Sequence, residues 1–240
     1  MEQSSLDAVK AVLAKESWAL EDYNQLMRDL ADVPDPAGKL RAAIAEMEAQ
    51  AGDMKGSAAV KVGIGRYAAC RFAEALDALS QGTDNKDRHY FQGLCLVQLR
   101  QYDKAIAEFE RARERGLEGP LCDVKIVEAL ALAGKFDEAE KALAKVKPAG
   151  SADALYVQGL IAELRGFGEK AAGLYDQARQ KAPNHPEATF RLAYYCDLHG
   201  SEDEAMELYR QCVAKPPIHA NALLNMAVLY EDAGEYDKAC

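Results

Sequence analysis

Apolar residues recur at the spacing of one helix face along almost the whole of this 240-residue chain. Between Leu6 and Leu30 they form a broad face that predicts one helix. Val33-Pro34-Asp35-Pro36 ends this helix because proline cannot continue the hydrogen-bond ladder. A second helix is predicted from about Ala37 to Ala51, where Gly52 follows. We interpret residues 1–56 as an N-terminal helical cap of two helices, with a separate docking element as the alternative.

From residue 57 onward the same pattern of apolar and polar positions returns at a nearly constant interval. The clearest copies are Gly234-Glu235-Tyr236-Asp237-Lys238-Ala239, Arg100-Gln101-Tyr102-Asp103-Lys104-Ala105 and Gly134-Lys135-Phe136-Asp137-Glu138-Ala139. The closing alanines of all six copies are Ala75, Ala105, Ala139, Ala171, Ala205 and Ala239, spaced 30, 34, 32, 34 and 34 residues apart. A period of this size is typical of stacked helix pairs, so residues 57–240 are predicted to hold five repeats and a truncated sixth.

Two further positions keep step with the closing alanines. Twelve residues before each alanine stand compact residues, namely Gly63, Gly93, Val127, Gly159, Ala193 and Ala227. Four residues after the first five alanines stand Leu79, Phe109, Leu143, Tyr175 and Tyr209. Two antiparallel helices need a small residue where their backbones approach, and a large apolar residue can fill the wedge against the next pair. A glycine suits the turn between them, although the first repeat carries Cys70 there.

With these registered positions the chain resembles the tetratricopeptide repeat family over residues 57–240. The resemblance implies an all-α fold, a right-handed superhelical solenoid of antiparallel helix pairs. It also implies that the first helix of each pair lines a concave inner wall on which peptides or partner helices bind. The inner-wall positions lie 18, 15, 14, 11 and 8 residues before each closing alanine.

The candidate partner-binding residues all occupy inner-wall positions. They are Tyr90, Tyr156, Phe190, Tyr194, Arg191, Lys125, Glu128, Glu163, Asp197, Asn221 and Asn225. The four aromatic residues among them would form a ladder of anchors, because exposed aromatic side chains dominate many protein interfaces. The alternative is that some of these rings pack between adjacent repeats.

Candidate chemistry is sparse. Cys196 and His199 lie three residues apart on one predicted helix, but no second ligand pair is near in sequence, so no metal site is predicted. Gly63-Ile64-Gly65 lacks the third glycine and the preceding strand of a nucleotide-binding loop. His185 and His219 are assigned to the loops between repeats. No catalytic residue and no cofactor is predicted, and the chain is interpreted as a protein that is not an enzyme.

The net charge and the distribution of cysteines limit the kinds of partner and of cellular compartment that we expect. The net charge of −10 opposes phosphate backbones and anionic membranes, so direct nucleic-acid contact is not expected and a basic protein or peptide is favoured. Six dispersed cysteines are assigned to helix cores as free thiols, which fits a reducing compartment. Residues 1–5 show no basic head followed by an apolar run, and no apolar stretch approaches about 18 residues, so we expect neither a secretory signal nor a membrane-spanning helix and predict a cytoplasmic location.

The leading hypothesis is a non-catalytic scaffold that binds a peptide or partner protein in a concave acidic groove. A second hypothesis rests on residues 221–234, which are similar to the last repeats of bacterial proteins whose tetratricopeptide array precedes a domain like the C-terminal domain of the RNA polymerase alpha subunit. The chain would then be the interaction module of a transcription-associated protein. A third hypothesis is self-association as a homodimer through the truncated sixth repeat, by Leu223, Leu224, Val228 and Leu229.

Overall fold

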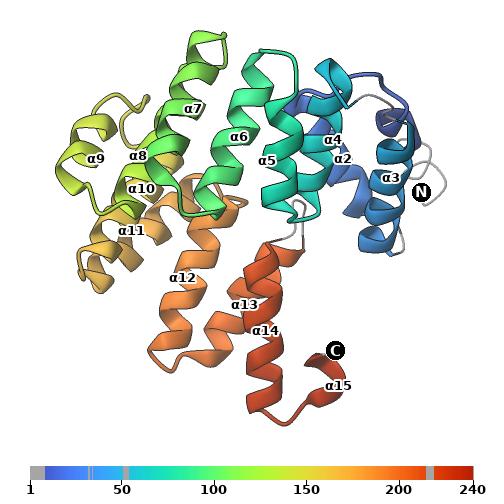
Figure 1. Ribbon diagram of the computed structural model, residues 1–240. Helices are drawn as coiled ribbons and strands as arrows, with labels where there is room; N and C mark the ends of the chain where they lie inside the picture. The colour runs from blue at the N-terminus through green and yellow to red at the C-terminus, as the bar shows by residue number, and fades with distance from the viewer. Residues whose placement is uncertain (1–8, 32, 34, 51–53, 215–218, 240) are drawn as a thin grey trace. The chain divides into compact units, whose positions relative to one another are not determined.

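The computed structural model describes the chain except residues 1–8, 32, 34, 51–53, 215–218 and 240. Within that part the structure consists of helices and turns without a strand, so the all-α prediction is confirmed (Figure 1). The named helices are α2 (Leu20–Ala31), α3 (Pro36–Gln50), α4 (Gly56–Ala68), α5 (Phe72–Ser80), α6 (Lys86–Gln98), α7 (Tyr102–Glu114), α8 (Gly119–Leu132), α9 (Phe136–Leu143), α10 (Ala152–Leu164), α11 (Gly168–Lys181), α12 (Pro186–Leu198), α13 (Glu202–Val213), α14 (Ala220–Asp232) and α15 (Tyr236–Ala239).

The chain forms two compact units, Met1–Lys135 (unit 1) and Phe136–Cys240 (unit 2). The division falls within the turn of the third predicted repeat. In unit 1, α4 packs on α5 and α6 packs on α7; in unit 2, α10 packs on α11 and α12 packs on α13 (Figure 1). The predicted boundary between a cap at 1–56 and an array at 57–240 stays a prediction.

In three of the helix pairs the residue twelve before the closing alanine is a glycine, Gly63, Gly93 or Gly159, and it lies against the side chain four residues after that alanine. A Cβ atom on Gly93 would lie 2.5 Å from Cε1 of Phe109, and one on Gly159 would lie 2.5 Å from Cε1 of Tyr175. Phe109 and Tyr175 are fully buried. The glycine is therefore required by the ring that covers it, and the buried aromatic residue closes the space between the two helices.

The turn between the two helices of a pair has the same backbone conformation in all six repeats. The residues five before the closing alanines have positive φ, with values of 59° for Cys70, 57° for Arg100, 74° for Gly134, 85° for Gly166, 76° for Gly200 and 72° for Gly234. The next residue donates its backbone N–H to a carbonyl five residues earlier, as Gln101 does to Leu96 over 2.8 Å. This left-handed helix end suits glycine, and Cys70 and Arg100 adopt it at a steric cost.

The prediction of one helix over the first 30 residues is wrong in the described part. Residues 9–13 are helical, residues 14–19 are not, and α2 begins at Leu20. The indole N–H of Trp18 donates to the carbonyl of Val12 over 3.0 Å, and the backbone N–H of Ala19 donates to Asp22 over 2.9 Å. These side-chain bonds satisfy backbone groups at the two helix ends, which allows the chain to break between them.

Four of the predicted core cysteines are buried free thiols, Cys95, Cys122, Cys196 and Cys212. Burial raises the pKa of Cys95 to about 12 and that of Cys122 to about 11. The assignment of Cys70 to a helix core is wrong, because Cys70 is exposed and occupies the left-handed turn after α4. Cys240 lies outside the described residues.

Candidate interaction surface

In unit 1 the inner-wall positions of α6 and α8 are largely occupied by internal contacts. Tyr90 is only 5% exposed, and its ring lies 5.8 Å from that of Phe91 and 5.9 Å from that of Phe109, measured between centroids. Lys125 pairs with Glu128 one turn further along α8, with 2.7 Å between Nζ and Oε2. Tyr90 therefore belongs to the core, and the charges of Lys125 and Glu128 offset each other.

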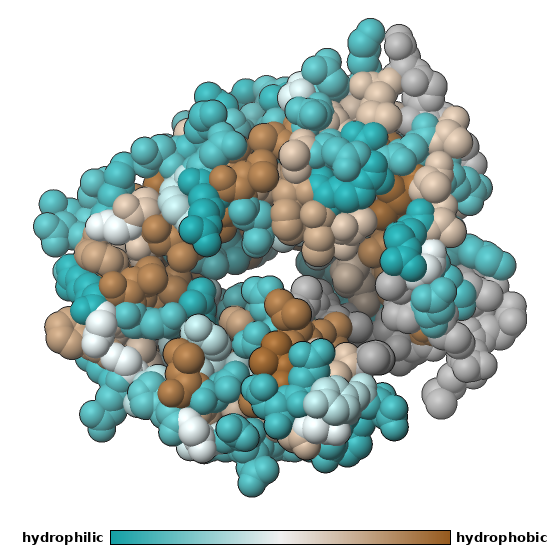
Figure 2. All heavy atoms as spheres, turned by 60° about the horizontal axis from the view of Figure 1, so that its bottom comes forward, coloured by the Kyte–Doolittle hydropathy of each residue, from teal (hydrophilic) through white to brown (hydrophobic). Residues whose placement is uncertain are grey.

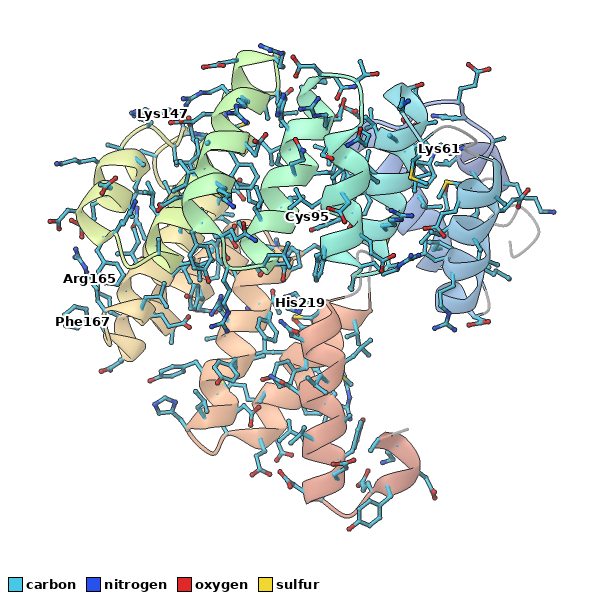
Figure 3. The ribbon with its side chains drawn as sticks, in the orientation of Figure 1. Lys61, Cys95, Lys147, Arg165, Phe167 and His219 are labelled. Atoms are coloured by element: carbon cyan, nitrogen blue, oxygen red, sulfur yellow. The ribbon has the colours of Figure 1, made fainter. Side chains whose placement is uncertain are left out.

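The inner-wall positions of α4 and α6 also hold the N-terminal segment, by which we mean residues 9–31. Lys61 donates from Nζ to the carbonyl of Leu13 over 2.7 Å (Figure 3). Asp87 accepts from the backbone N–H of Leu20 over 2.9 Å. Lys61 and Asp87 lie 14 and 18 residues before Ala75 and Ala105, so both occupy inner-wall positions of the repeat register. In this unit the chain covers part of its own inner wall.

In unit 2 the predicted aromatic ladder is graded from buried to exposed. Tyr156 is 1% exposed, Phe190 is half-buried, and Tyr194 is 39% exposed. Phe190 and Tyr194 stack with their ring planes 13° apart. Tyr156 therefore packs between repeats, as the alternative interpretation allowed, whereas Tyr194 presents its ring to solvent.

The predicted acidic residues of unit 2 accept hydrogen bonds from buried tyrosines. Tyr175 donates its hydroxyl group to Glu163 over 2.6 Å, and Tyr209 donates to Asp197 over 3.0 Å. The residue 14 before the next closing alanine joins each pair: Arg191 donates to Glu163 over 2.9 Å, and Asn225 donates to the hydroxyl group of Tyr209 over 2.8 Å. Four predicted site residues are thus tied into two polar networks that link consecutive repeats.

Two histidines form a repeated contact that the sequence interpretation missed. His185 and His219 precede α12 and α14, and each lies against the first helix of the preceding repeat. The ring of His185 lies 5.2 Å from that of Tyr156, and Nε2 lies 3.2 Å from Asp153. The ring of His219, which is labelled in Figure 3, stacks on that of Phe190 at 4.1 Å, with Nε2 3.6 Å from a carboxylate oxygen of Glu187. The signal was present, because the histidine, the acid and the aromatic residue each recur 34 positions apart.

Exposed apolar side chains concentrate in unit 2. Among the described residues, the large exposed ones are Leu164, Phe167, Tyr194, Leu198, Leu223, Leu224, Val228 and Tyr236. Five of these, which are Leu164, Tyr194, Leu198, Leu224 and Val228, lie 15, 11 or 7 residues before a closing alanine. Steps of four place them on one face of each first helix. We call these five residues the apolar face of unit 2. On the side of the molecule drawn in Figure 2, hydrophobic residues (brown) lie among hydrophilic ones (teal).

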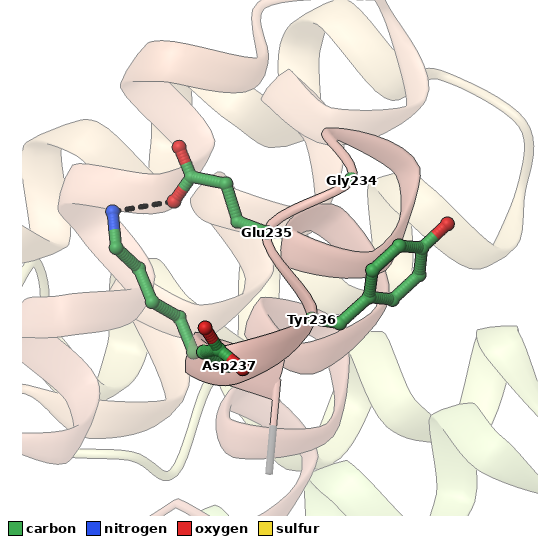
Figure 4. Close-up of a pocket in the computed structure, with 5 residues that line it drawn as sticks. Gly234, Glu235, Tyr236 and Asp237 are labelled. Atoms are coloured by element: carbon green, nitrogen blue, oxygen red, sulfur yellow. Dashed lines mark ion pairs between the residues drawn. The ribbon is translucent and has the colours of Figure 1, made fainter.

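Two surface hollows recur at one position of the repeat. One, of about 280 Å³, is lined by the five consecutive residues 234–238, including the ion pair between Glu235 and Lys238 (Figure 4). The other, of about 460 Å³, is lined by residues 100–104 together with Leu132, Ala133 and Lys135. Both begin at the left-handed turn residue of a repeat, so they follow from the shape of the turn. Neither gathers a nucleophile, a base and an electrophilic group.

Other kinds of site find no support in the described part of the chain. No cluster of three or more His, Cys, Asp or Glu side chains there is arranged to hold a metal ion. Cys196 is buried in α12, while His199 is exposed and its Nδ1 lies 2.7 Å from the carbonyl of Tyr195. Among the described helices, none combines the length and the hydropathy that a bilayer-spanning helix requires.

The paired helices, the left-handed turns and the packed glycines together define an array of helical repeats. The family model described as tetratricopeptide repeat matches residues 63–120, 92–154, 124–186 and 156–217. These matches span more than half of the chain, and the chain belongs to the tetratricopeptide repeat family. No curated protein sequence gives a significant match.

Solved structures of the same fold are similar to this chain at low sequence identity. A thermophilic tetratricopeptide repeat protein of Thermus thermophilus is 20% identical, with a TM-score of 0.55 over 72% of this chain and 97% of its own. A tetratricopeptide repeat protein of Parabacteroides merdae is 16% identical, with a TM-score of 0.52 over 99% and 90%. The APC/C hetero-tetramer Cut9–Hcn1 is 14% identical, with a TM-score of 0.58 over 99% and 50%. These matches support the fold, and the family is in general one of interaction modules.

Proposed function

We propose that this chain is a non-catalytic scaffold that binds a peptide or a partner protein on its inner-wall positions, in a groove formed by the first helices. The observation that carries the proposal is the apolar face of unit 2, in which Tyr194, Leu224 and Val228 occupy inner-wall positions. Its five exposed side chains come from three first helices, yet they occupy equivalent positions of the repeat. Exposed apolar residues gathered in this way mark binding surfaces more often than scattered ones do.

The partner would place apolar side chains against Tyr194, Leu224 and Val228. Asn221, which is exposed on α14, can hydrogen-bond the partner's backbone, and Arg191 supplies a cation that is already shared with Glu163. The net charge of −10 favours a partner of basic character at long range. Close contact would depend on the apolar face, because the nearby acids Glu163 and Asp197 are engaged by tyrosines.

Selection from a phage-displayed library of random peptides tests this function. Peptides enriched on the full chain should lose at least about tenfold in affinity for a Tyr194→Ser/Leu224→Ser/Val228→Ser variant, since burial of each apolar side chain contributes about 1.5–3 kcal/mol. Tyr236→Ser is the matched control, because Tyr236 is also exposed but lies outside the apolar face. Equal binding to both variants, or no enriched peptide, would contradict the proposal.

Self-association is a second candidate, favoured by the exposure of Leu223, Leu224 and Val228 on one helix, α14. Sedimentation velocity at two well-separated protein concentrations distinguishes it from peptide binding. A dimer that is lost in Leu223→Ser/Leu224→Ser would support self-association, and a concentration-independent monomer would exclude it. The hypothesis of a transcription-associated module draws no support from the family match or from these structures.

A further inference from the structure

The N-terminal segment contacts the wall of α4 and α6 at the two ends of its own break. Lys61 meets the carbonyl of Leu13, the last residue of the helical stretch 9–13. Asp87 meets the backbone N–H of Leu20, the first residue of α2. A helix carries partial negative charge at its C-terminal end and partial positive charge at its N-terminal end. The ammonium and the carboxylate therefore each face the helix end of opposite sign.

An aromatic contact lies beside this pair of charges. The ring of Tyr23 on α2 lies 5.8 Å from that of Tyr67 on α4 and 5.3 Å from that of Phe91 on α6, while Tyr67 and Phe91 are 5.4 Å apart. Burial raises the pKa of Tyr23 to about 12. Tyr67 and Phe91 occupy inner-wall positions of two consecutive repeats, 8 residues before Ala75 and 14 before Ala105. Together these two rings form a contact site for one aromatic side chain of a segment bound to this wall.

A further contact with the wall is made by Trp18, which lies in the non-helical residues 14–19. Trp18 is 3% exposed and lies beneath Lys61, whose Nζ is 6.0 Å from the indole centroid. The indole N–H is bonded to Val12 within the same segment. With the segment in place Asp87 is 6% exposed, and burial raises its pKa, while the backbone N–H of Leu20 donates to its carboxylate. The segment thus supplies a hydrogen-bond partner to both Lys61 and Asp87 on this wall.

We propose that the wall formed by Lys61, Tyr67, Asp87 and Phe91 is a binding site for an interrupted amphipathic helix. The N-terminal segment is the intramolecular ligand of this site. A partner of the same chemistry binds to the site by displacing the N-terminal segment. The inference rests on the proposed function, in which inner-wall positions bind peptides. The partner's segment must bring a free helix C-terminal carbonyl, a free helix N-terminal N–H and an aromatic side chain. A continuous helix fits poorly, because it has no free backbone groups at its middle.

A displacement experiment on the full wild-type chain tests the proposal. Trp18 is the only tryptophan of the chain, so its fluorescence reports the environment of the N-terminal segment. The probe is a synthetic peptide of residues 9–31 that carries Trp18→Phe and is silent in this measurement. Excess peptide should shift the emission of Trp18 to the red, whereas the same peptide with Tyr23→Ala should be much less effective. An unchanged spectrum at saturating peptide would overturn the proposal.

A second measurement removes the competition within the chain. The same peptide, dye-labelled, should bind a Trp18→Ala/Tyr23→Ala chain at least about tenfold more tightly than the wild type, because an attached ligand competes at an effective concentration on the order of millimolar. Adding Lys61→Ala/Asp87→Ala to that chain should abolish binding, and adding Lys104→Ala/Asp77→Ala should not. Equal affinity for the wild-type and weakened chains would contradict the proposal. The apolar face of unit 2 is unchanged in all these chains, so library selection still tests the proposed function separately.

Discussion

The hydroxyl group of Tyr175 lies 2.6 Å from a carboxylate oxygen of Glu163, and Tyr209 makes the equivalent bond to Asp197 one repeat later. In each case the tyrosine stands four residues after the closing alanine and the acid stands eight before it. Both tyrosine side chains are almost completely buried. The bond therefore holds the two helices of a pair together at the inner wall, where the same acid also meets the next repeat in the case of Arg191.

Removing the Tyr175 hydroxyl group should weaken unit 2. Tyr175→Phe is expected to lower the free energy of unfolding by about 1.5 kcal/mol, the lower end of the usual net contribution of a hydrogen bond to a charged group. Tyr195→Phe is the matched control, since the Tyr195 ring stacks on His199. Denaturant titration followed by circular dichroism measures both variants. A double-mutant cycle with Glu163→Ala, which removes the acceptor, should show coupling, and strictly additive effects would argue against the bond.

The glycine under the second-helix aromatic residue should not tolerate a methyl group. Gly93→Ala would place Cβ 2.5 Å from the ring of Phe109, which is fully buried and cannot move aside freely. We expect a loss of about 1–3 kcal/mol in the free energy of unfolding. Gly173→Ala in α11, where nothing lies within 4 Å, should instead stabilise by about 0.5–1 kcal/mol. Thermal and denaturant unfolding of the two variants would give shifts of opposite sign.

The left-handed turn offers a stabilising substitution. Arg100 has a φ of 57° at the position where four other repeats carry glycine. Arg100→Gly should raise the free energy of unfolding by about 1 kcal/mol, because glycine has no Cβ to clash in this conformation. Arg100→Ala removes the side chain without relieving the backbone, so it should give no such gain. If both variants change stability equally, the backbone conformation is not the cause.

Acid should remove one contribution to the stability of unit 1. Hydrogen bonds from Arg115 and then from His89 lower the pKa of Asp84 to about 2, from an ordinary value of 3.8. A lowered folded-state pKa means that the contribution is complete above the ordinary value and is lost as the pH falls towards about 2. His89 also faces Glu108, at 2.5 Å from Nδ1, so a second carboxylate belongs to the same contact.

The difference in unfolding midpoint between the wild type and Asp84→Asn should therefore be largest near neutral pH and should shrink below a pH of about 4. Urea titrations at several pH values measure it. Asp77→Asn, a change on the neighbouring helix α5, serves as the reference. A difference that stays constant from neutral pH to about pH 2 would show that Asp84 acts by some means other than its charge.

The helix pairs could be predicted from sequence because their determinants are local. Helical spacing of apolar residues, a compact residue at the close approach and a turn position with positive φ all recur within one repeat. The repeat positions of Gly93, Gly134 and Ala105 could therefore be assigned from the sequence before any contact was known. The break at residues 14–19 was missed because the local bonds of Trp18 and Asp22 are only part of what stabilises it. The other two partners, Lys61 and Asp87, lie far away in the sequence.

The burial of the aromatic residues at inner-wall positions also could not be predicted from their positions in the repeat. Tyr156 and Phe190 occupy the same repeat position, and Tyr194 lies one helical turn beyond Phe190. Their burial depends on contacts from other helices and from the following repeat, such as Tyr175 and His185 against Tyr156. The spacing of each histidine from its aromatic partner, 29 residues in both cases, was visible in the sequence. Only the structure shows that residues at this spacing are in contact.

The contacts of His185 and His219 bear on how such an array can lengthen. Each histidine contacts an acid and an aromatic ring at fixed positions of the repeat before it. The two junctions between repeats are therefore built from the same kinds of residue at the same repeat positions. A duplicated copy of residues 153–186 inserted after itself would find a matching neighbour on both sides. Growth of this array by duplication then requires no newly evolved interface, because the junction is copied together with its repeat.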